Sequence, residues 1–411
     1  MAFTSGLAVL PKHGRHLDIR RERMFRGPRN PIMNDGQRSR KRPNGVVRPD
    51  GETAGGNRFQ GSSDGAPHPV VRAPAASGSL FFLYVPCTPP RQTREMRIPT
   101  ILVAATLALA GLASPALAAG GNPLEKTNGF YVDPGSNPAA WVRDHPDDSL
   151  AGPIRTAIAT KPGARWFGSW SGDVRAAVDE YTYAADVADK LPVLVAYNIP
   201  GRDCGGESTG GAGSPEAYRD WISAFADGIG GKPAVVIIEP DVLAQLDCLP
   251  GDARQTRLDL LNYAAAQFAA KAPTTWAYLD GGNATWIPAP TMASRLKSAG
   301  VQSIHGFVLN VSNFHTTADS TTYGKAVDAA LGYAAPFVVD TSRNGSGHGT
   351  DSEWCNPPAR KLGAPSQLGG GPEMQLWIKV PGDSDGSCGY GTGIPAGTFS
   401  PALADHLIKG D

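Results

Sequence analysis

Two carboxyl groups follow one of the most apolar stretches of the sequence. Residues 234–238 read Ala-Val-Val-Ile-Ile, and Glu239, Pro240 and Asp241 come directly after them. A short apolar run of this kind predicts a buried strand. Carboxyl groups at the end of such a strand are candidates for acid–base chemistry, although a single strand-terminal aspartate is more often a helix N-cap.

Polar side chains also follow the other apolar runs: Tyr197 with Asp203, Asp280 with Trp286, Asn310 with Asn313, Asp340 with Arg343, and Lys379 with Asp383 and Asp385. In a closed parallel barrel the carboxyl ends of the strands meet on one face, where such folds assemble catalytic sites. Carboxylates and tryptophans with few histidines favour a sugar site. Each tryptophan could equally belong to the core, as for Trp166, Trp170, Trp286, Trp354 and Trp377.

The elements that would position these groups alternate along residues 119–411. Apolar runs predict strands within residues 193–200, 234–240, 274–280, 304–312, 335–342 and 374–380. Helical patterns lie between them, such as residues 252–272 and residues 214–229, where Ser214 stands at the N-cap and Pro215 at the first helical position. Repeated strand–helix units predict a parallel sheet, and a stretch of this length without a linker fits a single α/β barrel domain.

The first part of the chain has a different character. Residues 96–118 contain a basic Arg97, an apolar run and the small residues Ala116 and Ala118, a pattern typical of a secretory signal peptide. A transmembrane anchor is the alternative, but the run is shorter than the roughly 20 residues that a span needs, so we expect no stable membrane anchor. Export to the extracellular space is therefore the predicted localisation.

Residues 1–95 precede this signal and are rich in Gly and Pro, with more basic than acidic residues. A signal peptide works at the N-terminus, so Met96 is the expected start of translation and residues 1–95 the expected disordered segment upstream of it. A basic arm that binds nucleic acid is the alternative. Sparse aromatic residues and the absence of periodicity argue against it, so we expect no nucleic-acid partner.

The mature segment contains Cys204, Cys248, Cys355 and Cys388. Disulfides persist in exported proteins, and four cysteines allow three connectivities. Cys204 and Cys248 each follow a predicted strand, and Cys355 and Cys388 flank the last one, which favours the pairs 204–248 and 355–388. The spacing lacks a CxxC motif, so no metal site is expected.

Six sequence blocks together closely resemble glycoside hydrolase family 6. They are YNIPGRDCGGESTGGAG, IIEPDVLAQLDC, YLDGGNATW, VVDTSRNGSG, WCNPPARKLG and LWIKVPGDSDGSCG, and the resemblance extends from Asn122 to the C-terminus. It implies a secreted β-1,4-glucanase without a cofactor. It also implies a distorted, TIM-like β/α barrel of seven parallel strands, formed by one catalytic domain over residues 119–411.

The resemblance assigns roles to several carboxyl groups. Asp241 matches the general acid of the family, which needs a raised pKa to stay protonated near neutral pH. Asp203 matches the second carboxylate, which modulates that pKa and takes part in proton relay, and Asp385 matches the candidate base. Tyr197 and one hydroxyl, Ser208 or Thr209, are placed as relay groups, and Glu239 is expected to be structural.

The same resemblance predicts sugar contacts in the loops after the strands. In two of them this chain departs from the family pattern, since Asp383 stands where glutamate is common and Asn283 where histidine is frequent. Both departures bear on substrate affinity more than on the reaction. The expected substrate-binding residues are Trp166, Asp280, Asn283, Trp286, Asn310, Trp354, Lys379 and Asp383.

The segments after RDCGG and WCNPP are short, which predicts an open cleft and cleavage of internal bonds, with inversion at the anomeric carbon. The expected protein is a monomeric endo-β-1,4-glucanase that acts on a β-1,4-glucan oligosaccharide or polysaccharide. Two alternatives stay open: a cellobiohydrolase, and a cell-wall glycan-binding protein with the same fold and little turnover.

Overall fold

The computed structural model describes residues 121–349 and 354–411. The basic segment, the signal sequence and Cys87 lie outside these residues. Within the described part, no helix is both long and apolar enough to cross a membrane.

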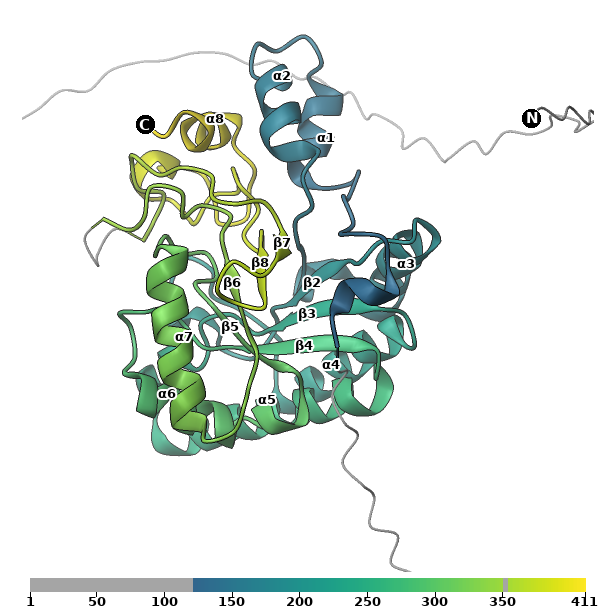
Figure 1. Ribbon diagram of the computed structural model, residues 1–411, viewed down its shortest axis with the longest axis vertical. Coiled ribbons are helices and arrows are strands. Elements are labelled where there is room, and N and C mark those ends of the chain that lie inside the picture. The colour runs from purple at the N-terminus through teal and green to yellow at the C-terminus, as the bar shows by residue number, and fades with distance from the viewer. Residues whose placement is uncertain (1–120, 350–353) are drawn as a thin grey trace, which may run out of the picture. The chain divides into compact units, whose positions relative to one another are not determined.

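The centre of the fold is a parallel sheet with strand order β1-β2-β3-β4-β5-β6-β8-β7 (Figure 1). All neighbouring pairs are parallel except β7 and β8, which are antiparallel. The seven parallel strands confirm the predicted fold class, and the two-residue β7 adds an eighth strand to it. The strands are β1 (Arg165–Phe167), β2 (Val193–Ala196), β3 (Ala234–Ile238), β4 (Thr275–Asp280), β5 (Gly306–Leu309), β6 (Phe337–Asp340), β7 (Gln367–Leu368) and β8 (Met374–Leu376).

The sheet curls until its first and last parallel strands approach each other. No ladder joins β1 to β8, but the Ala164 amide donates to the Trp377 carbonyl oxygen at 2.8 Å, and the Trp166 indole donates to the Ile378 carbonyl oxygen at 2.8 Å. The barrel therefore closes through two hydrogen bonds next to the strand ends, which leaves a seam between β1 and β8.

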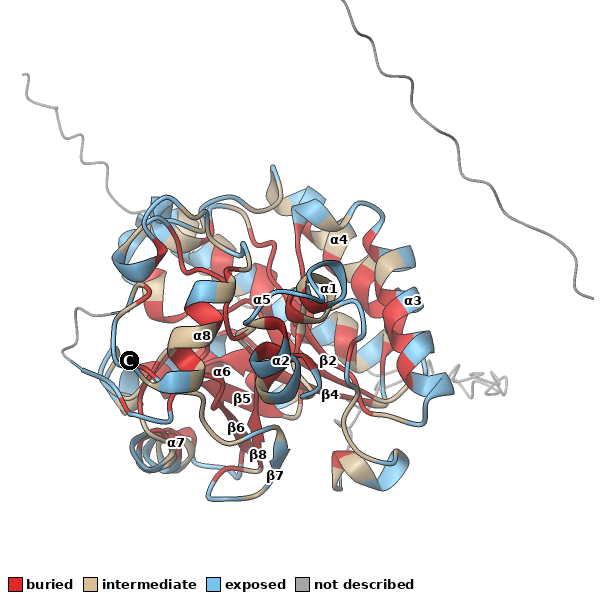
Figure 2. Ribbon diagram, turned by 90° about the horizontal axis from the view of Figure 1, so that it is seen from above, coloured by how far each residue is buried: buried red, intermediate tan, exposed pale blue. Residues whose placement is uncertain are grey.

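Helices surround this barrel, and their outward faces are exposed while the strands β2 to β6 and β8 are buried (Figure 2). α3 to α7 follow the strands, and the shorter α1 and α2 pack with the C-terminal α8 on one side of the sheet (Figure 1). The helices are α1 (Asn137–Asp144), α2 (Ala151–Ile154), α3 (Val174–Val187), α4 (Pro215–Ile229), α5 (Gly251–Lys271), α6 (Ala289–Ser298), α7 (Thr317–Leu331) and α8 (Pro401–Lys409).

Alternate residues of each strand belong to two different cores, as the two-residue period of a strand requires. Val193 and Val195 of β2 pack inside the barrel with Trp276 and Tyr278 of β4. Leu194 faces outward and packs against the helices. The filled interior leaves the strand ends as the place where polar side chains can gather.

Candidate active site

A cleft of about 1160 Å³ opens at the carboxyl ends of the strands. The structure brings most of the predicted site residues to its wall: Tyr197, Asp203, Ser208, Asp241 and Asp385 of the proposed machinery, and Trp166, Asn283, Trp286, Trp354, Lys379 and Asp383 of the predicted sugar contacts. Thr209, the alternative relay hydroxyl, lines it as well. Asp280 and Asn310 do not reach the cleft; they are buried beneath its floor.

Backbone strain gathers at these strand ends. Asp203, Glu239, Asp241 and Asn310 have φ values of 60°, 51°, 71° and 68°, in the left-handed region that non-glycine residues seldom adopt. Such strain is common at functional sites, where surrounding contacts hold it in place. The backbone turns left-handed at Glu239 and at Asp241, which are only two residues apart. Glu239 bonds to the loop after β2, whereas Asp241 lies in the cleft.

Glu239 supports the loop after β2 from below. Its carboxylate accepts hydrogen bonds from the backbone amides of Asn198 and Ile199, each at 3.0 Å, and it is fully buried. Burial raises the pKa of Glu239 to about 7, although the two amides act in the opposite direction. Glu239 does not line the cleft, so its position fits the structural role that we expected.

Asp241 lies half-buried in the cleft. Burial raises its pKa well above the usual range, and the charges of Asp280 and Asp203 add to the effect. Asp280 also fixes the backbone of Asp241, since its Oδ2 accepts the Asp241 amide at 2.6 Å. A carboxyl group in this setting keeps its proton near neutral pH and can donate it.

Asp203 is held by one donor on each oxygen. Its Oδ2 accepts the backbone amide of Ser208 at 2.7 Å, and its Oδ1 accepts the side-chain amide of Gln245 at 3.1 Å. The contact of Ser208 with Asp203 therefore runs through the backbone. Next to Asp203, the Arg202 guanidinium is 4.6 Å from the Tyr197 ring centroid and 5.2 Å from that of Trp170.

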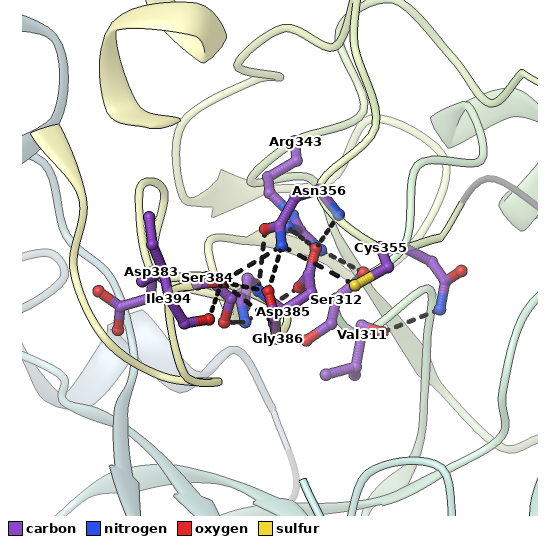
Figure 3. A network of polar contacts seen from close by, with 12 residues as sticks. Val311, Ser312, Arg343, Cys355, Asn356, Asp383, Ser384, Asp385, Gly386 and Ile394 are labelled. Atoms are coloured by element: carbon purple, nitrogen blue, oxygen red, sulfur yellow. Dashed lines mark hydrogen bonds and ion pairs between the residues drawn. The ribbon is translucent and has the colours of Figure 1, made fainter. Parts of the chain in front are cut away.

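Asp385 is surrounded by hydrogen-bond donors, among them Arg343 and Asn356 (Figure 3). Its Oδ2 accepts Arg343 Nη1 at 2.7 Å and the Asn356 amide at 3.0 Å, and its Oδ1 lies 3.1 Å from Lys379 Nζ. Burial alone would raise the pKa of Asp385, but the charges of Arg343 and Lys379 outweigh it and lower that pKa. Asp385 is therefore an anion under conditions where Asp241 holds its proton.

Asp383 differs from Asp385 although it is only two residues away. Its Oδ2 accepts Asn137 Nδ2 at 2.9 Å, and its Oδ1 is buried without a hydrogen-bond partner among the described residues. Burial raises the pKa of Asp383 to about 7, while Lys379 acts against this shift. An unpartnered carboxyl oxygen beside the cleft suits a hydrogen bond to a ligand hydroxyl.

Aromatic faces complete the walls of the cleft. Trp170, Trp286 and Trp354 are exposed by 56%, 39% and 50%, which is unusual for tryptophan and leaves apolar surface free for stacking. Trp377, in contrast, is buried in the core between α1, α2 and α8. In the described part of the chain, no group of three or more His, Cys, Asp or Glu side chains is arranged to hold a metal ion.

Two disulfides, Cys204–Cys248 and Cys355–Cys388, fasten the loops around the cleft and confirm the predicted pairing. A further contact joins two of these loops, since Glu207 Oε2 accepts the Ser387 amide at 3.1 Å. Gly386 is required there, because a Cβ at this position would lie 2.5 Å from Glu207 Cγ.

Several residues that line the cleft were not predicted, among them Asn137, Arg202, Glu207 and Gln245. Arg202, Glu207 and Gln245 lie inside the sequence blocks that resemble the family, but no residue pattern marks them as members of the site. Asn137 is 246 residues away from Asp383, the residue it contacts, and only the fold brings the two together.

A parallel α/β barrel whose cleft combines a proton-holding carboxyl, a charged carboxylate and exposed tryptophans defines a glycoside hydrolase. Residues 126–410 match the model of Glycosyl hydrolases family 6, and the chain belongs to this family.

Similar proteins carry names from the same family. The chain is 52% identical to Endoglucanase 1 of Streptomyces halstedii, over 77% of this chain and 99% of that protein. The structure of the endoglucanase Cel6 from Mycobacterium tuberculosis, in complex with methyl-cellobiosyl-4-deoxy-4-thio-β-D-cellobioside, is 40% identical, with a TM-score of 0.66 over 71% of this chain and 99% of that one. The 1,4-beta-D-glucan cellobiohydrolase C of Emericella nidulans is 28% identical, over 64% of this chain and 71% of that protein.

Proposed function

We propose that the protein is an endo-β-1,4-glucanase that hydrolyses internal bonds of cellulose-like glucans with inversion. The observation that carries this proposal is the placement of two carboxyl groups in one cleft, Asp241 next to Asp280 and Asp385 paired with Arg343 and Lys379, which shifts their pKa values in opposite directions. Relatives named endoglucanases at 52% and 40% identity support internal cleavage more strongly than cellobiohydrolases at 28% do.

In the proposed reaction Asp241 donates its proton to the glycosidic oxygen as the bond breaks. Water attacks the anomeric carbon from the opposite face, and its proton passes to a carboxylate. Asp385 is the candidate base. Its two cations make it a weak one, so a relay through Tyr197 and the hydroxyl of Ser208 or Thr209 to Asp203 is the other route.

The sugar chain would lie along the tryptophans of the cleft. Trp166, Trp286 and Trp354 offer ring faces, and Asn283, Lys379 and Asp383 offer hydrogen bonds. Asp280 and Asn310 are left out of this set, because their burial makes them supports of the loops. Asp280 holds the Asp241 amide, and Asn310 bonds to the Asp340 and His315 carbonyl oxygens.

We also propose that the protein is exported and works as a monomer outside the cell. The two disulfides support this location, since such bonds persist in oxidising compartments.

The Asp241→Asn variant tests the role of the general acid. An amide cannot protonate a poor leaving group, so hydrolysis of unactivated cello-oligosaccharides should fall by about 10² to 10⁴-fold. Unchanged binding of the same oligosaccharides, measured by calorimetry, serves as the control for folding. Activity close to that of the wild type would assign the acid to another residue, and a wild-type protein that binds glucans without turnover would favour the glycan-binding alternative.

The mode of cleavage is tested with soluble carboxymethylcellulose. Internal cuts shorten chains early, so viscosity should fall before much reducing sugar appears. Release of cellobiose with nearly constant viscosity would instead indicate a cellobiohydrolase.

The stereochemistry is read from the first product. Direct attack by water on a β-linked glucan gives the α-anomer, which proton NMR detects within minutes, before mutarotation. Initial accumulation of the β-anomer would mean a covalent intermediate and would contradict the roles given to Asp241 and Asp385.

A further inference from the structure

Gln245 is the one residue bonded to both Asp203 and Asp241 among the hydrogen bonds that the structure describes. It belongs to the short helical turn Ala244–Cys248 after β3. Its side-chain Nε2 donates to Asp203 Oδ1 at 3.1 Å, and its backbone amide donates to the Asp241 carbonyl oxygen at 2.9 Å. A single glutamine at the wall of the cleft is thus hydrogen-bonded to both carboxyl-bearing loops.

The amide of Gln245 turns its NH₂ group toward the Asp203 carboxyl group, and the reverse orientation would place two oxygens against each other. Oε1 of Gln245 is buried and has no partner among the described residues. Gln245 thus makes its contact with Asp203 although its other amide atom is left without a partner.

A disulfide holds together the two segments that form the hydrogen bond between Gln245 and Asp203. Cys204 directly follows Asp203, Cys248 lies three residues after Gln245, and the disulfide between them spans 44 residues of sequence. Asp203 and Cys204 both have left-handed backbones, with φ of 60° and 47°. A covalent link next to each partner keeps donor and acceptor close, so the hydrogen bond costs little additional ordering of the chain.

We propose that Gln245 is a positioning residue for the hydrolysis, which holds the Asp203 carboxyl group in one orientation at the wall of the cleft that contains Asp241. The inference rests on the proposed function and adds a residue to it. Without the Gln245 amide, the Asp203 side chain would keep one donor, the Ser208 amide, and its carboxyl group would be free to turn away.

Gln245→Leu removes the donor at similar side-chain volume. A hydrogen bond to a charged group contributes enough that kcat should fall by about ten- to a hundredfold, with KM for cello-oligosaccharides nearly unchanged. Gln245→Glu keeps the shape but offers an oxygen in place of the amide donor, so its kcat should fall at least as far, again with KM nearly unchanged.

Gln255→Leu is the matched control. Gln255 makes the same kind of bond on the exposed surface of α5, from its Nε2 to Asp259 Oδ1 at 2.8 Å. Its loss should leave kcat, KM and the pH profile unchanged.

A double-mutant cycle separates positioning from general support of the fold. In the Asp203→Asn background, Gln245→Leu should have almost no further effect on kcat, since the carboxyl group that Gln245 positions is already absent. Equal losses in both backgrounds, or kcat values of Gln245→Leu and Gln245→Glu that match that of the wild type, would overturn the inference while the wild-type enzyme still cleaves glucans. Should Gln245→Leu not fold, the kcat and KM of Gln245→Glu decide. Failure of the wild type to cleave glucans would instead refute the proposed function.

Discussion

Lys379 is the cation that connects the carboxyl groups of the site. Its Nζ lies 3.1 Å from Asp385 Oδ1, and its charge lowers the pKa of Asp385, Asp241 and Asp383 alike. Both the acidic and the basic limb of the pH dependence of activity should therefore depend on Lys379. The acidic limb requires Asp385 to be ionised, and the basic limb requires Asp241 to be protonated.

We expect Lys379→Met to move both limbs toward higher pH. Loss of the cation raises the pKa of Asp385, so its ionisation needs a higher pH, and it also raises the pKa of Asp241, which then keeps its proton longer. The pH dependence of kcat/KM on cello-oligosaccharides measures both shifts. Lys271→Met, which removes a surface pair with Asp227 at 2.8 Å, is the control. Limbs that stay in place or move apart would contradict the assignment.

At this scale the sequence predicted the carboxyl groups better than their surroundings. Asp203, Asp241 and Asp385 were found because they follow strands, where a barrel collects polar groups. Asp280 also stands at a strand end, as the last residue of β4, yet its side chain lies beneath the cleft. Position along the chain does not tell whether a side chain at a strand end points into the cleft or below it, and a lone Gln245 gives no pattern at all.

At the scale of the elements, Glu239 connects β3 to the loop after β2. Glu239→Ala would leave the buried amides of Asn198 and Ile199 without acceptors, at a cost of about 1 to 3 kcal/mol each. The free energy of unfolding in urea should therefore fall by about 2 to 6 kcal/mol. Glu180→Ala on exposed α3 should change it by less than about 0.5 kcal/mol. A loss as small as that of the control would show that water replaces the carboxylate.

The Glu239→Gln variant adds a dependence on pH. The pKa of Glu239 in the folded protein, about 7, exceeds its ordinary value, so the stabilisation by this group is fully present at low pH and is lost as pH rises through 7. Glutamine does not titrate. The stability difference between wild type and Glu239→Gln should consequently shift in favour of the variant as the pH rises from about 4.5 to about 7, and a constant difference over this range would contradict the raised pKa.

The elements themselves were predictable where they are long and uniformly apolar, as β2 to β6 are. β1 escaped prediction because it has three residues, Arg165–Phe167, of which only Phe167 is buried. β7 has two exposed residues and pairs only with β8. Tertiary contacts rather than local pattern make such strands, and the seam beside β1 could not be inferred from the sequence.

For the molecule as a whole, the disulfides are expected to supply a large share of stability. Cys204–Cys248 and Cys355–Cys388 span 44 and 33 residues, and loops of these lengths correspond to about 4 kcal/mol each in the chain-entropy view. Replacing either pair by serines should lower the unfolding free energy by roughly that amount, measured in urea without reductant. Adding dithiothreitol should destabilise the wild type but not a variant that lacks both pairs. If the wild type and the variants were equally stable, the disulfides would contribute nothing to the free energy of unfolding.

The Cys204–Cys248 disulfide beside Asp203 also affects when the loops of the cleft become joined to each other. A newly made chain in a reducing cytoplasm would lack the Cys204–Cys248 bond, so the loop of Asp203 and the turn of Gln245 would not yet be fastened to each other. With the export that we propose, this disulfide would form only after the chain reaches an oxidising compartment, so the Asp203 loop and the Gln245 turn would be joined only after the protein has left the cytoplasm.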